Sequence, residues 1–249
     1  MRTRIPSAHH PATAEARLTG FLYILYFLSA LPLSLRARLI VPADAATTAA
    51  RILASEATYR LTMVTDLASY LLYLGIVYLF YRLLKPISPP WAMVGALFAT
   101  VGCIVLIMAT ALLTAPLLLL ADPGVFVIGL PERQELALLS LKLFGQAYLI
   151  ALFLFGAQWL VMGPLFATSR LVPRPIGWLL TIGGGAWVVL SVATLLAPAI
   201  GKPLQGIVFP LGALAEIALG LWLLVKGVDV DALSPPADRA SKQGAAAGG

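Results

Sequence analysis

The sequence predicts an all-α integral membrane protein, a six-transmembrane-helix bundle with a short helix at the outer surface between the first two transmembrane helices. Composition is the first observation behind this prediction: 60% of the 249 residues are hydrophobic and 11% are charged, against about 25% charged in soluble domains. The mean hydropathy is +0.93. Long apolar runs, separated by clusters of Pro, Gly and charge, are the second observation. They lack the two-residue alternation of a membrane β-barrel.

Six apolar runs come close to the length of about 20 residues that crosses a hydrocarbon core of about 30 Å. They lie at residues 18–35, 61–81, 91–120, 136–162, 176–197 and 207–225. The first run follows a basic segment, as the apolar part of a cleaved signal peptide would. However, Arg36 and Arg38 stand directly after it, which is a poor setting for cleavage. We therefore expect the first helix to remain in the protein.

Positive charge in the connections predicts that both termini lie in the cytoplasm, because Lys and Arg in short loops resist translocation. In this orientation ten of the seventeen Lys and Arg residues lie inside. The short loops carry the clearest bias: Arg82, Lys85, Arg170 and Arg174 lie inside, and Lys202 alone lies in the fifth loop, outside.

The connections divide the chain further. We expect the first connection, 37–60, to hold a helix that begins after Asp44, because Asp is a good N-cap and Pro42 disfavours helix just before it. This helix leads directly into the second span. The third connection, 121–135, has the Pro, Gly and charged residues of an exposed loop. The expected domains are a cytoplasmic N-terminal tail (1–16), a transmembrane domain (17–228) and a disordered cytoplasmic tail (229–249).

Three ionisable residues within the spans are the candidates for function: Asp66, Lys142 and Glu216. Each such group costs about 2.5–3.5 kcal/mol at mid-membrane unless it is paired, neutralised or hydrated. In the orientation above, all three lie in the outer half of the bilayer or near its middle. We therefore expect them to turn inward, toward one another or toward trapped water.

Helical spacing adds neighbours to these residues. Tyr59, Thr62, Asp66, Tyr70 and Tyr73 recur every three or four residues and form one stripe, which should face protein or water.

The other two candidates also have neighbours at helical spacing. Glu135, Lys142 and Gln146 share a face of the fourth span, so Lys142 is a candidate counter-ion for either acid. Gly212 and Gly220 flank Glu216 at four residues on either side and allow a neighbouring backbone to approach.

Two interpretations of this constellation stay open. In the first, Asp66 and Glu216 bind a cation or proton in a polar pocket open to the outside, shaped by Lys142, Arg60 and the tyrosines. In the second, the same groups only pair to hold the bundle together, with Lys142 and Asp66 reaching the membrane interface. The pocket candidates are Asp66, Lys142, Glu216, Arg60, Tyr70, Tyr73 and Gln146.

Several chemistries are excluded. The only histidines, His9 and His10, lie in the polar N-terminal tail, so no span supplies a haem ligand or a Ser-His dyad. The single cysteine, Cys103, permits neither an intrachain disulfide nor a cysteine-based metal site. We expect no cofactor and no metal. The scattered basic residues form no nucleic-acid patch.

Four stretches resemble a known family. They are Ala16-Arg17-Leu18-Thr19-Gly20, Asp44-Ala45-Ala46-Thr47-Thr48-Ala49 with Arg60, Ser169-Arg170-Leu171-Val172-Pro173 with Gly177, and Glu-Ile-Ala-Leu-Gly-Leu-Trp-Leu-Leu-Val-Lys-Gly at 216–227. The sequence is similar in them to the bacterial membrane proteins grouped as domain of unknown function 4386 (DUF4386). The resemblance implies six spans and a bacterial inner membrane, and it transfers no catalytic residue.

Three functions remain open. The first is a non-enzymatic protein that binds or moves a small solute, ion or lipid through an outward-facing polar pocket. The second is an accessory or assembly subunit, whose Gly-rich fifth and sixth helices pack against another membrane protein or a second copy. The third, a membrane lipid-modifying enzyme using Asp66 and Glu216 as acid and base, is the least favoured.

Overall fold

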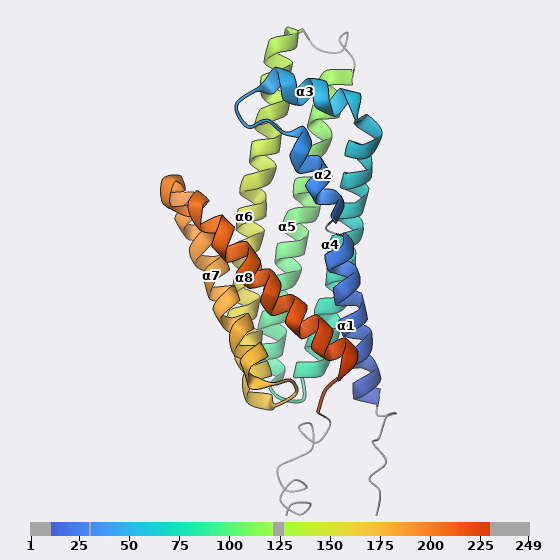
Figure 1. Ribbon diagram of the computed structural model, residues 1–249, viewed down its shortest axis with the longest axis vertical. Helices are drawn as coiled ribbons and strands as arrows, with labels where there is room; N and C mark the ends of the chain where they lie inside the picture. The colour runs from blue at the N-terminus through green and yellow to red at the C-terminus, as the bar shows by residue number, and fades with distance from the viewer. Residues whose placement is uncertain (1–10, 30, 122–126, 230–249) are drawn as a thin grey trace, which may run out of the picture.

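The computed structural model describes residues 11–29, 31–121 and 127–229, and within them the chain forms eight α-helices (Figure 1). Six stretches of helix are long and apolar enough to cross a membrane, with α1 and α2 forming one of them together. This confirms the predicted six-helix bundle. The helices are α1 (Pro11–Ser29), α2 (Leu31–Leu39), α3 (Ala45–Ala54), α4 (Glu56–Leu84), α5 (Pro89–Ala121), α6 (Leu130–Ser169), α7 (Arg174–Leu196) and α8 (Pro198–Val225).

The long helices form a closed ring in the order α1, α4, α5, α6, α7 and α8, because α8 packs back against α1. In Figure 1, α8 crosses the bundle obliquely to reach α1. The core inside the ring contains a cluster of aromatic residues. The centroid of the Phe80 ring lies 5.6 Å from that of Trp159 and 5.8 Å from that of Phe166. Residues far apart in the sequence therefore line one interior.

Helix lengths show that the two ends of the bundle differ. At 1.5 Å per residue, the 40 residues of α6 span about 60 Å, whereas the 23 residues of α7 span about 35 Å. Only the latter matches a hydrocarbon core of about 30 Å. In Figure 1, α3 and the adjacent ends of α4 and α6 extend beyond the junction of α7 and α8. We call this the α3 end, and the opposite end, with the α4–α5 and α6–α7 turns, the turn end.

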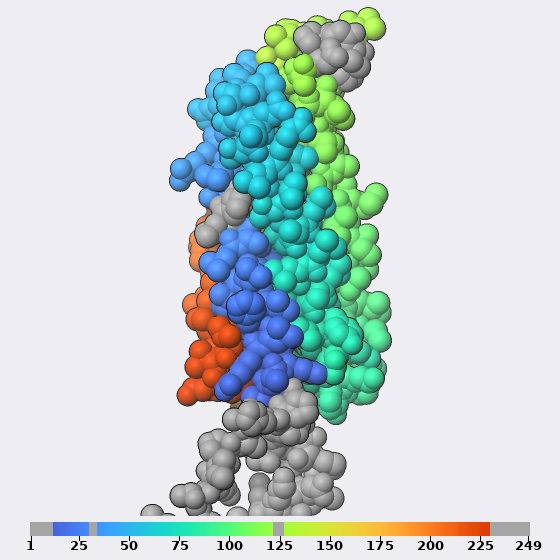
Figure 2. All heavy atoms as spheres, turned by 90° about the vertical axis from the view of Figure 1, so that its right-hand side faces the viewer, coloured from blue at the N-terminus to red at the C-terminus, as the bar shows by residue number. Residues whose placement is uncertain are grey.

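The outer surface is apolar, as contact with lipid requires. Figure 2 shows one face, on which α1, α4 and α5 lie side by side. Exposed large apolar residues occur along all three helices, among them Leu25, Leu61, Leu71 and Leu97.

The predicted helix of the first connection is present as α3. Asp44 is its N-cap, with the carboxylate accepting the Thr47 backbone N–H at 2.8 Å. Ala49 and Ile52 are buried against the bundle, and only Ser55 separates α3 from α4. The cap and the direct passage into the second span are as the sequence predicted.

The predicted starts of two helices, α6 and α8, were too late in the sequence, because both helices begin before the apolar runs do. Helix α6 starts at Leu130, so residues 130–135 are not loop, and Arg133 is buried and donates to the Leu119 carbonyl at 3.2 Å. Helix α8 starts at Pro198, so Lys202 is helical and exposed. Proline suits a first helical turn, where its missing N–H would have no partner.

The expected tails are only partly described. Helix α1 begins at Pro11, so residues 11–16 of the predicted N-terminal tail are helical. Residues 1–10, and the predicted C-terminal tail except Asp229, lie outside the described residues.

Candidate functional site

A small polar cavity lies inside the helix ring and brings the two predicted acids together. It has a volume of about 90 Å³ and is lined by side chains of six helices. Asp66 and Glu216 both line it. The other lining residues are Tyr26, Ser69, Tyr70, Tyr73, Leu106, Tyr148, Leu152, Phe155 and Trp187.

Glu216 is held by two neutral donors. The Tyr23 hydroxyl of α1 donates to its Oε2 atom, and the Trp159 indole Nε1–H of α6 donates to Oε1 at 3.0 Å. The glutamate is buried, with 4% of its surface exposed. Gly20 of α1 lets the two helices come together near the carboxyl group, because a Cβ there would lie only 2.7 Å from the Gly220 carbonyl oxygen of α8.

Asp66 has an ionic partner instead. The Arg36 guanidinium of α2 donates to Asp66 Oδ2, and both side chains are buried. Close by, the Ser29 and Ser69 hydroxyls are 2.7 Å apart and join α1 to α4. Asp66 is therefore neutralised by a fixed cation.

Tyrosines line the cavity together with the two acids. The Tyr73 hydroxyl donates to Gln158 Oε1 at 3.1 Å, and the Tyr26 and Tyr73 ring centroids are 4.9 Å apart. The predicted stripe of α4 faces the interior over its whole length. All five members are buried: Tyr59, Thr62, Asp66, Tyr70 and Tyr73.

The size of the cavity restricts what it can hold. One water needs about 10–15 Å³ of cavity space, so about 90 Å³ accommodates several waters. Sites for drug-sized ligands have about 300–1,000 Å³. Water, a proton or a small ion fits this space, and a lipid or an organic solute does not.

Three predicted pocket residues lie elsewhere. Lys142 is exposed and lines a separate surface hollow of about 1020 Å³ at the α3 end, with Asp44, Glu132 and Glu135. The prediction that Lys142 is the counter-ion of an acid in the cavity was therefore wrong, since Arg36 has that position. The physical reason that Lys142 lies outside the cavity is the length of α6. Lys142 lies about 18 Å from the helix start, on a segment that extends beyond α7.

Gln146 and Arg60 also lie away from the cavity. Gln146 is exposed on α6. Arg60 binds Glu56 at 2.7 Å on the exposed side of α4. The cavity thus contains Asp66, Tyr70, Tyr73 and Glu216 of the predicted set.

Sequence reasoning missed Arg36, Tyr23 and Trp159. Arg36 looked like part of a solvated connection, yet an arginine immediately after an apolar run can continue the helix and turn inward. For Tyr23 and Trp159 the available signal was weak, because aromatic residues in apolar spans usually pack without a specific role. The described residues include no group of three or more His, Cys, Asp or Glu able to hold a metal.

Comparison with known proteins gives one match. The model of a family described as a domain of unknown function (DUF4386) matches residues 18–227. No curated protein and no solved structure matches the sequence.

Proposed function

We propose that this chain, which belongs to the DUF4386 family and has the helices of a multi-pass membrane protein, binds and releases a proton at Glu216 within the tyrosine-lined cavity. We further propose that it lies in a bacterial inner membrane with the turn end in the cytoplasm. The basic turns at that end support this orientation.

One contrast carries the proposal. Asp66 has the Arg36 guanidinium beside it, whereas among the described residues no ion pair involves Glu216. Its partners Tyr23 and Trp159 are neutral. An ionised carboxylate within a membrane is costly without a compensating charge, and a bound proton removes that cost.

The two donors suit both protonation states. The indole N–H of Trp159 can only donate, so Oε1 of Glu216 remains an acceptor whether or not the group is ionised. The Tyr23 hydroxyl can donate to a carboxylate or accept from a carboxylic acid. The hydrogen bond from Trp159 is therefore kept in both protonation states, whereas the one with Tyr23 reverses direction and frees the Tyr23 hydroxyl hydrogen for another acceptor.

The cavity supports proton binding over the wider alternatives. Its volume of about 90 Å³ leaves room for waters beside the tyrosine hydroxyls, but none for an organic solute, a lipid or an enzyme substrate.

Two glycines of α7 and α8 make their close contacts within the chain. Gly184 packs against the Gly156 carbonyl and Trp159, and Gly212 packs against Trp187. Gly206 of α8, by contrast, has nothing within 4 Å.

Infrared difference spectroscopy of the full chain in nanodiscs tests the proposal. Among the carboxylic acid C=O bands that appear and disappear reversibly between acid and alkaline pH, we expect one at the higher frequency of a buried carboxyl group, apart from the bands of the exposed acids. Glu216→Gln should abolish this band, and Glu132→Gln, a matched change on the surface of α6, should retain it.

Two outcomes would overturn proton binding. One is a band unaffected by Glu216→Gln. The other is loss of the Glu216 band when sodium ions are added at constant pH, which would identify a metal cation as the ligand.

A further inference from the structure

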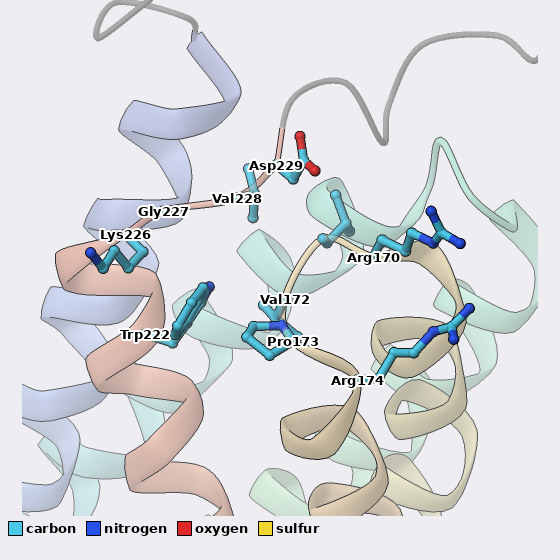
Figure 3. Close-up of a pocket in the computed structure, with 10 residues that line it drawn as sticks. Arg170, Val172, Pro173, Arg174, Trp222, Lys226, Gly227, Val228 and Asp229 are labelled. Atoms are coloured by element: carbon cyan, nitrogen blue, oxygen red, sulfur yellow. The ribbon is translucent and has the colours of Figure 1, made fainter. Parts of the chain in front are cut away.

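A second cavity, of about 510 Å³, lies at the turn end and shares no lining residue with the proposed proton site (Figure 3). The α6–α7 turn forms one wall, and the end of α8 with the segment after it forms the other. Leu171, Val172 and Val228 are buried beneath it. The cavity is therefore part of the packed fold.

Backbone geometry holds the two walls together. Arg170 ends α6 with a positive φ of 63°, and Gly227 turns the chain after α8 with a φ of 73°. The Asp229 backbone N–H then donates to the Leu171 carbonyl at 3.2 Å. This bond fixes the segment after α8 to the α6–α7 turn.

The border of the cavity is positively charged. Arg170, Arg174 and Lys226 are exposed, and none of them belongs to an ion pair among the described residues. In Figure 3 the two arginines lie on one side of the hollow and Lys226 on the other, and all three charged ends extend outward from its border. The only acid of the lining, Asp229, points away from Trp222 at the rim.

The length of α7 points to a position of the cavity at the level of lipid headgroups. Helix α7, at about 35 Å, just crosses the hydrocarbon core and begins at Arg174. Trp222 lies one turn before Lys226, as aromatic residues do at membrane interfaces. No side chain caps the first turn of α7, so the positive end of its dipole faces the same place.

We propose that this cavity binds the phosphate headgroup of an anionic phospholipid. Arg170 and Arg174 lie together at one side of the hollow, and Arg is well suited to phosphate oxygens, with Lys226 adding positive charge at the opposite side. Trp222 and the apolar floor favour a lipid over a free anion, because they offer contact to the glycerol and upper acyl region. The volume also lies within the range of ligand sites.

Thermal unfolding of the full chain in detergent tests this proposal, with phosphatidylglycerol and phosphatidylcholine of the same acyl chains as probes. We expect phosphatidylglycerol to raise the Tm more than phosphatidylcholine does. The double variant Arg170→Gln/Arg174→Gln should lose at least half of that difference, and Lys226→Gln should lose part of it. The control Lys85→Gln/Lys202→Gln removes the same charge outside the cavity and should keep the difference.

Unchanged stabilisation of the Arg170→Gln/Arg174→Gln and Lys226→Gln variants by phosphatidylglycerol would overturn the site. Inorganic phosphate supplies the second arm. If phosphate alone raised the Tm as much as phosphatidylglycerol does, the ligand would be a soluble anion, and the lipid assignment would be wrong.

Discussion

Arg36 and Asp66 form a buried ion pair between α2 and α4, with 5% and 10% of their side chains exposed. The Arg36 guanidinium also lies 5.2 Å from the centre of the Phe144 ring on α6. One arginine thereby connects α2 with two long helices and neutralises the acid at one side of the cavity. Glu216, the other acid of the cavity, is bound by neutral groups, and this difference separates a structural charge from a candidate proton site.

Removing Arg36 should strongly destabilise the protein. Arg36→Gln leaves Asp66 buried without its cation, and breaking a buried pair in this way costs about 3–5 kcal/mol. The double variant Arg36→Met/Asp66→Leu removes both charges. Its loss of unfolding free energy should be smaller than the sum of the losses in Arg36→Met and Asp66→Leu. Reversible unfolding in mixed micelles measures these free energies.

Arg60→Gln is the control for Arg36→Gln. Its ion pair with Glu56 is exposed, with 58% and 41% of the side chains accessible, and such pairs contribute about 0–1 kcal/mol. Equal losses in Arg36→Gln and Arg60→Gln would show that burial of the Arg36–Asp66 pair has no energetic consequence.

Two glycines of α6 should respond oppositely to alanine. A methyl group at Gly156 would lie 2.6 Å from the Gly184 carbonyl oxygen and 3.0 Å from the Val188 nitrogen, both in the backbone of α7. Backbone cannot move aside cheaply, so we expect Gly156→Ala to cost about 1–3 kcal/mol. At Gly145 nothing lies within 4 Å, and Gly145→Ala should stabilise the helix by up to about 1 kcal/mol. Unfolding free energies compare the two, and a neutral Gly156→Ala would contradict close α6–α7 packing.

Helix α3 should lose stability in acid. The Thr47 hydroxyl and backbone N–H hydrogen-bond to the Asp44 carboxylate and lower its pKa below the ordinary value, mainly through the side chain. Because the pKa of Asp44 is lower in the folded state than in the unfolded state, its stabilisation of α3 is complete above the unfolded-state pKa. It disappears as the pH falls through the folded-state pKa.

Hydrogen exchange of the α3 amides measures this effect. Protection should decrease as Asp44 becomes protonated in the native protein. In Asp44→Asn the cap remains but carries no titrating group, so this pH dependence should vanish. Identical pH profiles for the native protein and Asp44→Asn would exclude Asp44 as its source.

Much of the fold could be predicted because its signals are local. The apolar runs identified the spans, and Asp44 with Pro42 identified α3, since capping depends on residues a few positions apart. Helix starts were less predictable. Pro198 and Leu130 begin helices inside stretches that resembled loops, because the first turn of α6 is charged and that of α8 contains Pro and Gly.

The sequence by itself determined that the chain is a bundle of membrane-spanning helices and that the acids Asp66 and Glu216 must avoid lipid. Only the tertiary structure decided their partners, Arg36 for Asp66, and Tyr23 with Trp159 for Glu216. The reason is geometric. Spacing specifies which residues share a face of one helix, but the rotation, tilt and length of every neighbour decide which faces meet. Lys142 shows the difference: its charge suggested a buried partner, and the length of α6 left it exposed.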